Sequence, residues 1–126
     1  MSFARFAPFL LLALPVAASA QSMNAESFHR RAEALQKKGP LAVFSGGEIK
    51  ALMGEAKAAG QKSGANRAAA LKAGQKPRYC PPPPPVRMGN TEFMAGLSAI
   101  APPDRARIDM TEAMTRIMMR KYPCPG

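Results

Sequence analysis

Tryptophan is absent from the 126-residue sequence, and histidine occurs once, as His29. Histidine is the side chain that titrates near neutral pH and most often serves in proton transfer and metal binding, and no nucleophile motif surrounds this one. The eight acidic residues are scattered, with no pair at a spacing typical of acid–base catalysis. We therefore expect no catalytic residue, no metal site and no cofactor, and predict that the protein is not an enzyme. Because His29 directly follows Phe28, we expect it at the surface or at the edge of the fold.

Long hydrophobic runs are also lacking. The longest apolar stretch, FAPFLLLALPVA, is too short to span a bilayer and is interrupted by two prolines. It follows Arg5 and precedes Ala-Ser-Ala, the pattern of a signal peptide cleaved between Ala20 and Gln21. We predict a signal peptide at residues 1–20, a single helical domain at residues 21–126, and a periplasmic or secreted location without a membrane span.

Acidic residues are few, and the formal net charge is +10. Without Arg5, 17 basic residues face 8 acidic ones, a charge of +9. Such a charge suits an acidic protein, an anionic envelope surface or nucleic acid. Export and the low aromatic content argue against nucleic acid, so we expect another protein or an anionic envelope surface as the partner. Four basic residues recur every five positions, a spacing that winds around a helix and predicts solvated surface: Lys57, Lys62, Arg67 and Lys72.

Only two cysteines are present, Cys80 and Cys124. In a small exported domain two cysteines usually pair, so we predict a Cys80–Cys124 disulfide. The pair lacks CxxC spacing and neighbouring histidines, which disfavours a redox or metal-binding role. The disulfide lies in a proline-rich connector, residues 77–88, whose run Pro81–Pro85 is expected to be a stiff extended spacer. A ligand for an aromatic-lined groove is the alternative use of such a run.

No segment alternates apolar and polar residues for long enough to form a strand. Capping residues and helix breakers bound four expected helices: from Asn24 to Gly39-Pro40, from Ser45 to about Ala73, from Asn90 to Pro102-Pro103, and from between Asp104 and Asp109 to Pro123. The second is expected to be one long helix, with a break near Gly60–Gly64 as the alternative. The fold class predicted is all-α, a small bundle of about four helices held by one disulfide.

Local patterns refine two helix starts and the inward faces. Ser45 with Glu48 resembles a capping box, Phe44 with Ile49 resembles a hydrophobic staple, and Asp109 begins a second pair of the capping-box kind. Apolar residues at helical spacing are expected to face the core. They are Ala25, Phe28, Ala32 and Leu35; Ile49, Leu52, Met53 and Ala56; Phe93, Met94, Leu97 and Ile100; and Met110, Ala113, Met114, Ile117 and Met118.

Methionine is abundant, with nine residues. Met110, Met114 and Met118 form a row at every fourth position, and such a row can present thioethers to Cu(I). On the apolar side of an amphipathic helix, methionine more often fills irregular gaps in a core. We predict the core role, and an adaptable surface for partners is the alternative left open.

Several features occur together in the last third of the chain: Cys80-Pro81, Asn90-Thr91, Pro102-Pro103 with Arg105, Ala113, and Tyr122-Pro123-Cys124. In this combination, residues 79–124 resemble the C-terminal half of the Rap/Tai family, periplasmic immunity proteins against type VI secretion amidase effectors. The resemblance implies a helical, disulfide-bonded fold that neutralises a cell-wall amidase by stoichiometric, non-enzymatic binding, as a monomer or a homodimer. It assigns no binding residue in this chain.

A second interpretation is a small periplasmic stress protein or chaperone of the HdeA kind. Proteins of that kind are likewise exported, helical and held by one disulfide. Its basis here is the methionine-rich apolar face together with the strong positive charge. The eight acidic residues limit any change that acid could trigger.

Overall fold

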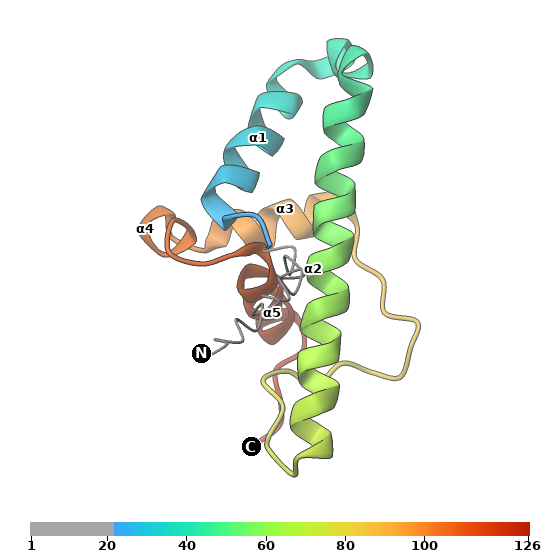
Figure 1. Cartoon of the computed structure of the whole chain (residues 1–126), viewed down its shortest axis with the longest axis vertical. Coiled ribbons are helices and arrows are strands. Elements are labelled where there is room, and N and C mark those ends of the chain that lie inside the picture. The colour runs from blue at the N-terminus through green and yellow to red at the C-terminus, as the bar shows by residue number, and fades with distance from the viewer. Residues whose placement is uncertain (1–21) are drawn as a thin grey trace, which may run out of the picture.

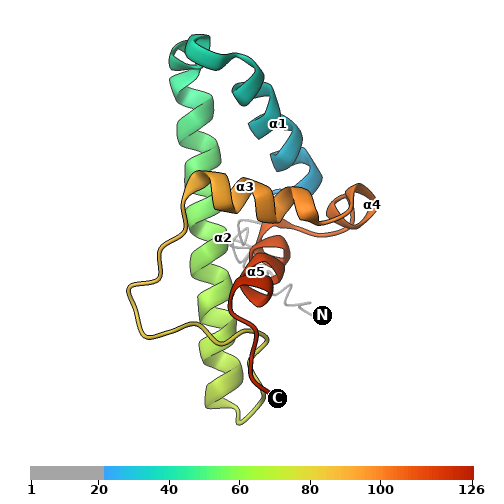
Figure 2. The same ribbon diagram turned by 180° about the vertical axis from the view of Figure 1, so that it is seen from behind.

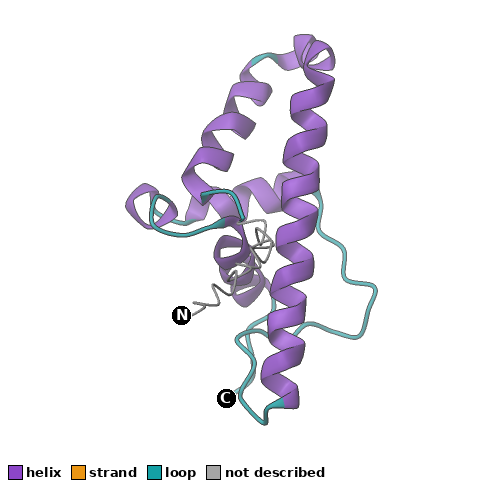
Figure 3. Cartoon of the chain, in the orientation of Figure 1, coloured by secondary structure: helices purple, strands orange, loops and turns teal. Residues whose placement is uncertain are grey.

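The helix α2 (Gly46–Lys72) runs along most of the molecule, and α1 (Ala25–Lys37), η1 (Gly39–Ser45) and α5 (Met110–Lys121) pack against it (Figure 1). The computed structural model describes residues 22–126, so the predicted signal peptide lies outside the described residues. The described part contains five α-helices, one 3₁₀-helix and no strand (Figure 3), which confirms the all-α prediction. The remaining elements are α3 (Asn90–Ala99) and α4 (Pro102–Arg105). None of these described helices has the length and apolar character needed to cross a membrane.

The helices α1 and α2 form a hairpin joined by η1 (Figure 1). Asn24 caps α1 as predicted, because its Oδ1 accepts hydrogen bonds from the backbone N–H groups of Glu26 and Ser27 at 3.0 and 3.1 Å. Gly39 follows α1 with φ +53°, a left-handed conformation that glycine adopts without steric cost. Gly39 and Pro40 therefore end α1 where the sequence predicts.

The predicted capping box and hydrophobic staple at the start of α2 are wrong. The Ser45 side chain makes no cap hydrogen bond, and its Oγ instead accepts one from Lys38 Nζ at 2.8 Å. The Glu48 carboxylate accepts two hydrogen bonds from Arg31 of α1, at 2.6 and 2.7 Å, and Phe44 is 85% exposed. The physical reason is that the chain enters α2 through a 3₁₀-helix, so Ser45 lacks the extended backbone of a capping residue.

The helix α2 is continuous through Gly60 and Gly64, which decides between the two predicted alternatives. A glycine inside a helix costs about 1 kcal/mol relative to alanine. Tertiary contacts offset this cost, because α5 packs along α2 and the chain after α2 folds back onto it. Arg67 Nε donates a hydrogen bond to the Tyr79 carbonyl at 2.9 Å, which fixes this return.

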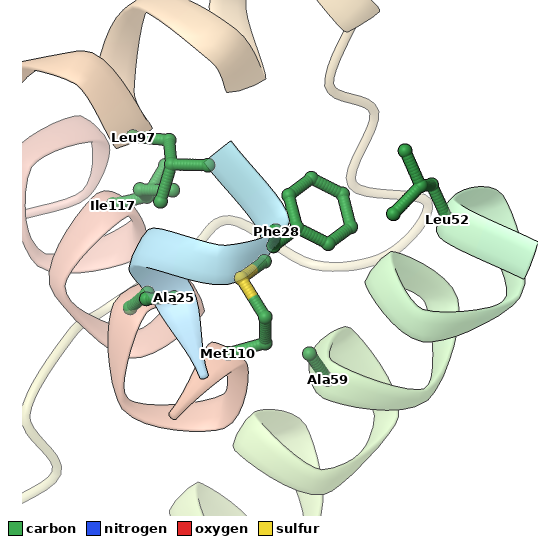
Figure 4. Close-up of a cluster of buried hydrophobic side chains, with 8 residues drawn as sticks. Ala25, Phe28, Leu52, Ala59, Leu97, Met110 and Ile117 are labelled. Carbon is green, nitrogen blue, oxygen red and sulfur yellow. The ribbon is translucent and has the colours of Figure 1, made fainter. Parts of the chain in front are cut away.

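The hydrophobic core lies where α1, α2, α3 and α5 meet (Figure 4). Leu97 and Met110 are fully buried, and the rings of Phe28 and Phe93 pack edge to face with centroids 5.7 Å apart. The predicted inward faces are confirmed for the buried cluster of Ala25, Phe28, Leu52, Leu97, Met110, Ala113 and Ile117. Met53 departs from the prediction, with 62% of its side chain exposed, because it lies at the edge of a cavity instead of in the core.

His29 is buried, contrary to the expected surface or edge position. Its Nε2 lies 3.0 Å from Ser98 Oγ and 3.8 Å from the Glu33 carboxylate. The prediction assumed that α1 buries only the face of Phe28. In the structure α1 contacts α2, α3, α4 and α5, so a second face of the helix is covered.

Arg105 is a buried cation. The sequence indicates its place in the family resemblance but predicts neither its burial nor its contacts. Pro102-Pro103 begin the one-turn helix α4, which was not predicted, and α4 places Arg105 against α1 and the end of α3. Arg105 Nε donates a hydrogen bond to the Glu26 carboxylate at 2.6 Å. Its Nη1 donates to three backbone carbonyls: Ile100 at 2.7 Å, Ser98 at 3.3 Å and Leu97 at 3.4 Å. This arginine therefore satisfies carbonyls at the end of α3. Its hydrogen bond lowers the pKa of Glu26 below its ordinary value.

The helices α1 and α5 begin side by side. The Ala25 N–H donates to the Ile108 carbonyl at 3.0 Å, and the Met110 N–H donates to the Met23 carbonyl at 2.7 Å, on either side of an isolated bridge between Asn24 and Asp109. Asp109 caps α5 as predicted, since its Oδ1 accepts from the Glu112 N–H at 2.8 Å. The other half of the predicted capping-box pair is wrong, because the Glu112 carboxylate accepts hydrogen bonds from Arg78 and Arg116 instead. We name this backbone pairing of the two helix starts the clasp.

The predicted disulfide between Cys80 and Cys124 is present. Beside it the Cys80 N–H donates to the Tyr122 carbonyl at 2.8 Å, so the end of α5 is joined to the chain that returns from α2. The connector at residues 77–88 contains no helix and bows outward from the body of the molecule (Figure 2).

The helices α3 and α5 approach closely at Gly96. A Cβ atom at this position would lie 3.0 Å from Ile117 Cγ2 and 3.2 Å from Cγ1. Ile117 is itself buried in the core, so it has little room to move. Glycine is thus required here by the contact between two helices.

We expect Gly96→Ala to lower the free energy of unfolding by about 1 kcal/mol or more, because overpacking against Ile117 exceeds the gain in helix propensity. The matched control is Gly54→Ala in α2, where a Cβ atom would meet nothing within 4 Å. This change should raise the free energy of unfolding by about 0.5–1 kcal/mol. Urea unfolding measures both. Ile117→Ala removes both Cγ atoms that a Cβ at position 96 would meet, so Gly96→Ala should cost less in that background. Equal effects at the two glycines would contradict the prediction.

Candidate functional site: a methionine-lined groove

A cavity of about 440 Å³ lies between α2, the connector, α3 and α5. Three methionines from two segments line it: Met88 of the connector, and Met114 and Met118 of α5. Phe93 and the buried Tyr79 complete its apolar wall, while Lys57 of α2 lies at its edge.

A second cavity, of about 210 Å³, continues the first toward the hairpin end of α1 and α2. The two cavities share Ala56, Asn90 and Phe93, so they form one surface. Met53 of α2 and Met94 of α3 line the second cavity. We name the joint surface the methionine groove, after Met53, Met88, Met94, Met114 and Met118.

The methionine row of α5, Met110, Met114 and Met118, is divided between the core and the methionine groove. Met110 is fully buried, which confirms the core role for that residue. Met114 packs against the core and also lines the groove, whereas Met118 lines the groove and is not part of the core cluster. Met118 therefore fits the alternative prediction, an adaptable surface for partners. Its neighbour in the groove, Met88, was not predictable from the spacing of residues along α5.

The chemistry of the methionine groove favours an apolar partner. Of the described residues that line either cavity, none is acidic. Unbranched thioether side chains change rotamer readily and fit differently shaped apolar groups, so methionine-rich surfaces accept varied protein segments. The groove is suited to binding exposed hydrophobic side chains of another polypeptide.

A separate small cavity, of about 110 Å³, is polar. At its inner side Ser63 Oγ lies 2.8 Å from Thr115 Oγ1 and 3.1 Å from Tyr79 Oη, and Thr115 donates to the Thr111 carbonyl at 3.0 Å. These hydroxyls satisfy one another, which stabilises the contact of α2 with α5. Because both side-chain partners of Ser63 are hydroxyls, no base in contact with it activates it as a nucleophile.

Charged groups beside the polar cavity are also paired. Arg78 donates two hydrogen bonds to Glu112, at 2.6 and 2.8 Å, and Arg116 donates a third at 3.1 Å. The hydrogen bond from Arg78 is the main cause that lowers the pKa of Glu112. Within the described residues, no three histidine, cysteine, aspartate or glutamate side chains are placed to hold a metal ion.

Comparison with known protein families, with curated proteins and with solved structures finds no match to this chain. The resemblance of residues 79–124 to the Rap/Tai family stays a prediction.

Proposed function

We propose that the protein is an exported, non-enzymatic binding protein that holds another protein in the methionine groove. The observation that carries the proposal is the groove itself, an open apolar surface lined by five methionines from α2, the connector, α3 and α5. Export is supported by the signal-peptide pattern and by the disulfide, which persists in oxidising compartments. The proposed partner is a cell-wall amidase effector, which the family resemblance suggests, and inhibition follows from occlusion of its cleft.

The first test is capture of the partner from the periplasm. Cells express the full chain with a C-terminal affinity tag, and gentle cross-linking before purification is followed by mass spectrometry. We expect one stoichiometric amidase, whose hydrolysis of peptidoglycan is then inhibited by the purified protein at a 1:1 ratio. If no amidase is captured, and none encoded beside the gene is inhibited, the amidase proposal fails.

The groove is tested with two neighbouring residues of α5. Met118 lines the groove, while Met119 is 37% exposed and lines neither cavity. Met118→Lys places a charge in the apolar surface and is expected to weaken partner binding about tenfold or more. Met119→Lys adds the same charge to the same helix and should change binding little. Thermal unfolding of both variants controls for misfolding, and equal binding by the two would exclude the groove.

A chaperone of the HdeA kind is the second candidate, and the adaptable methionine groove is the observation that favours it. It predicts suppression of client aggregation at low pH. Arginine partners lower the pKa values of Glu26, Glu48 and Glu112, in each case mainly through a hydrogen bond. Carboxylates with lowered pKa values stabilise the fold at neutral pH, and that contribution is lost only as the pH falls through the lowered values. The contribution of these three carboxylates is therefore lost only below the ordinary pKa range of glutamate.

A further inference from the structure

The turn between α1 and α2 presents large apolar side chains to solvent. Leu41, Val43 and Phe44 of η1 are 65%, 74% and 85% exposed. Isolated exposed apolar residues are common, but three within four positions form a patch, and such patches mark interaction sites. We name these three residues the apolar tip. It does not contribute to the methionine groove, because none of its residues lines either cavity.

Positive charge flanks the apolar tip on both sides. Lys37 and Lys38 end α1, and Lys50 lies in the first turns of α2, all three exposed. Between Lys37 and Gly47 the sequence contains no acidic residue. The next acidic residue along the chain, Glu48, is held by two hydrogen bonds from Arg31. The surface is therefore apolar at its end and cationic just behind it.

The apolar tip also occupies one end of the molecule. The hairpin turn lies at one extreme of the long axis, far from the C-terminal end of α5 and from the lower end of α2 (Figures 1 and 2). A projecting turn can enter a soft surface without contact by the rest of the protein. Its backbone is in a 3₁₀-helix, whose internal hydrogen bonds reduce the cost of leaving water.

We propose that the apolar tip docks the protein on the surface of an anionic phospholipid bilayer. Leu41, Val43 and Phe44 enter the boundary between headgroups and acyl chains, and the flanking lysines contact anionic headgroups. Peripheral membrane segments bind through the same two contributions, the burial of apolar area and the attraction of lysine to anionic lipid. The lysines on both sides of the tip favour this occupant over an apolar protein pocket, which would not need them. The proposal goes beyond the protein-binding groove and does not depend on it.

The absence of tryptophan from the sequence allows a direct test. The full chain is expressed and exported, and its mass is measured so that retention of the apolar segment near the N-terminus is known. Phe44→Trp then carries the only tryptophan, and its emission should shift to shorter wavelength with phosphatidylglycerol–phosphatidylethanolamine vesicles. Leu71→Trp, at the opposite end of α2 and 47% exposed, should show no shift. No shift at position 44, or an equal shift at both positions, would overturn the proposal.

Vesicle co-sedimentation separates the apolar and the electrostatic contributions. Phe44→Ser is expected to weaken binding to the anionic vesicles about tenfold or more, whereas Leu71→Ser leaves it unchanged. The double variant Lys37→Glu with Lys50→Glu should also weaken binding to the vesicles. The control is Lys72→Glu with Lys76→Glu, which changes the net charge by the same amount and should weaken binding far less. Equal losses for the two lysine pairs would mean unspecific attraction of a basic protein and would overturn the proposal. Loss of protein capture but not of vesicle binding in Phe44→Ser would instead assign the tip to a protein partner.

Discussion

Arg105→Ala is expected to lower the free energy of unfolding by about 3–5 kcal/mol, one of the two largest single effects in this protein. Arg105 is 5% exposed, and its guanidinium binds Glu26 and three backbone carbonyls at the end of α3. Truncation removes the buried guanidinium from the Ser98 and Ile100 carbonyls, and it leaves the Glu26 carboxylate with Arg30 as its remaining arginine partner. Chemical unfolding at neutral pH, followed by circular dichroism, measures the loss.

The control for Arg105→Ala is Arg107→Ala, two positions later and exposed. It removes the same charge and should change stability by less than about 0.5 kcal/mol. A double-mutant cycle with Glu26→Gln then isolates the ion pair from the carbonyl contacts. If Arg105→Ala costs no more than Arg107→Ala, the buried position of Arg105 is wrong.

Removal of the disulfide by Cys80→Ser with Cys124→Ser is expected to cost about 4 kcal/mol, from the entropy that the bridge removes from the unfolded chain. The bridge closes a loop with a sequence separation of 44 and holds the end of α5 to the chain that follows α2. The closed loop contains α3, α4 and α5, and in the unfolded chain the bridge alone holds its two ends together. We expect the double variant to unfold at markedly lower urea concentration.

A reducing agent provides the control for the disulfide. Dithiothreitol should destabilise the natural protein to about the level of the double serine variant and should leave that variant unchanged. Replacing both cysteines removes the bridge without leaving a free thiol, so oxidation to dimers does not complicate the measurement. A loss under about 1 kcal/mol would show that the loop is already ordered without the bridge.

Features decided by neighbouring residues were predicted correctly. The caps at Asn24 and Asp109 form hydrogen bonds to N–H groups within three residues, so the local sequence contains all that they require. The disulfide was also predictable, because only Cys80 and Cys124 are available. Both kinds of inference need no knowledge of how the helices pack.

Features decided by distant residues were missed. The Glu48 carboxylate fits a capping box in the local sequence, yet Arg31, 17 positions earlier, binds it instead. His29 is covered by α3, and Arg105 is buried only because α4 turns back onto α1. Each outcome depends on contacts between helices that periodicity does not specify.

The candidate site was predictable only in part. The spacing of Met114 and Met118 identified one apolar side of α5, but Met53, Met88 and Met94 come from three other segments. Their assembly depends on the path of the connector across α2. The available signal was the number of methionines itself, since nine residues of this adaptable type occur in the sequence.

The clasp has a consequence for the timing of folding. It joins the start of the described chain to the start of α5, and side chains add to it: Asn24 Nδ2 donates to the Ala106 carbonyl, 82 positions later, and Ser22 Oγ lies 2.5 Å from Thr111 Oγ1. Synthesis proceeds from the N-terminus, so α1 cannot complete its packing until α5 has emerged from the ribosome. The core of a nascent chain built this way is completed only late in synthesis, once the first turn of α5 is available to pair with the start of α1.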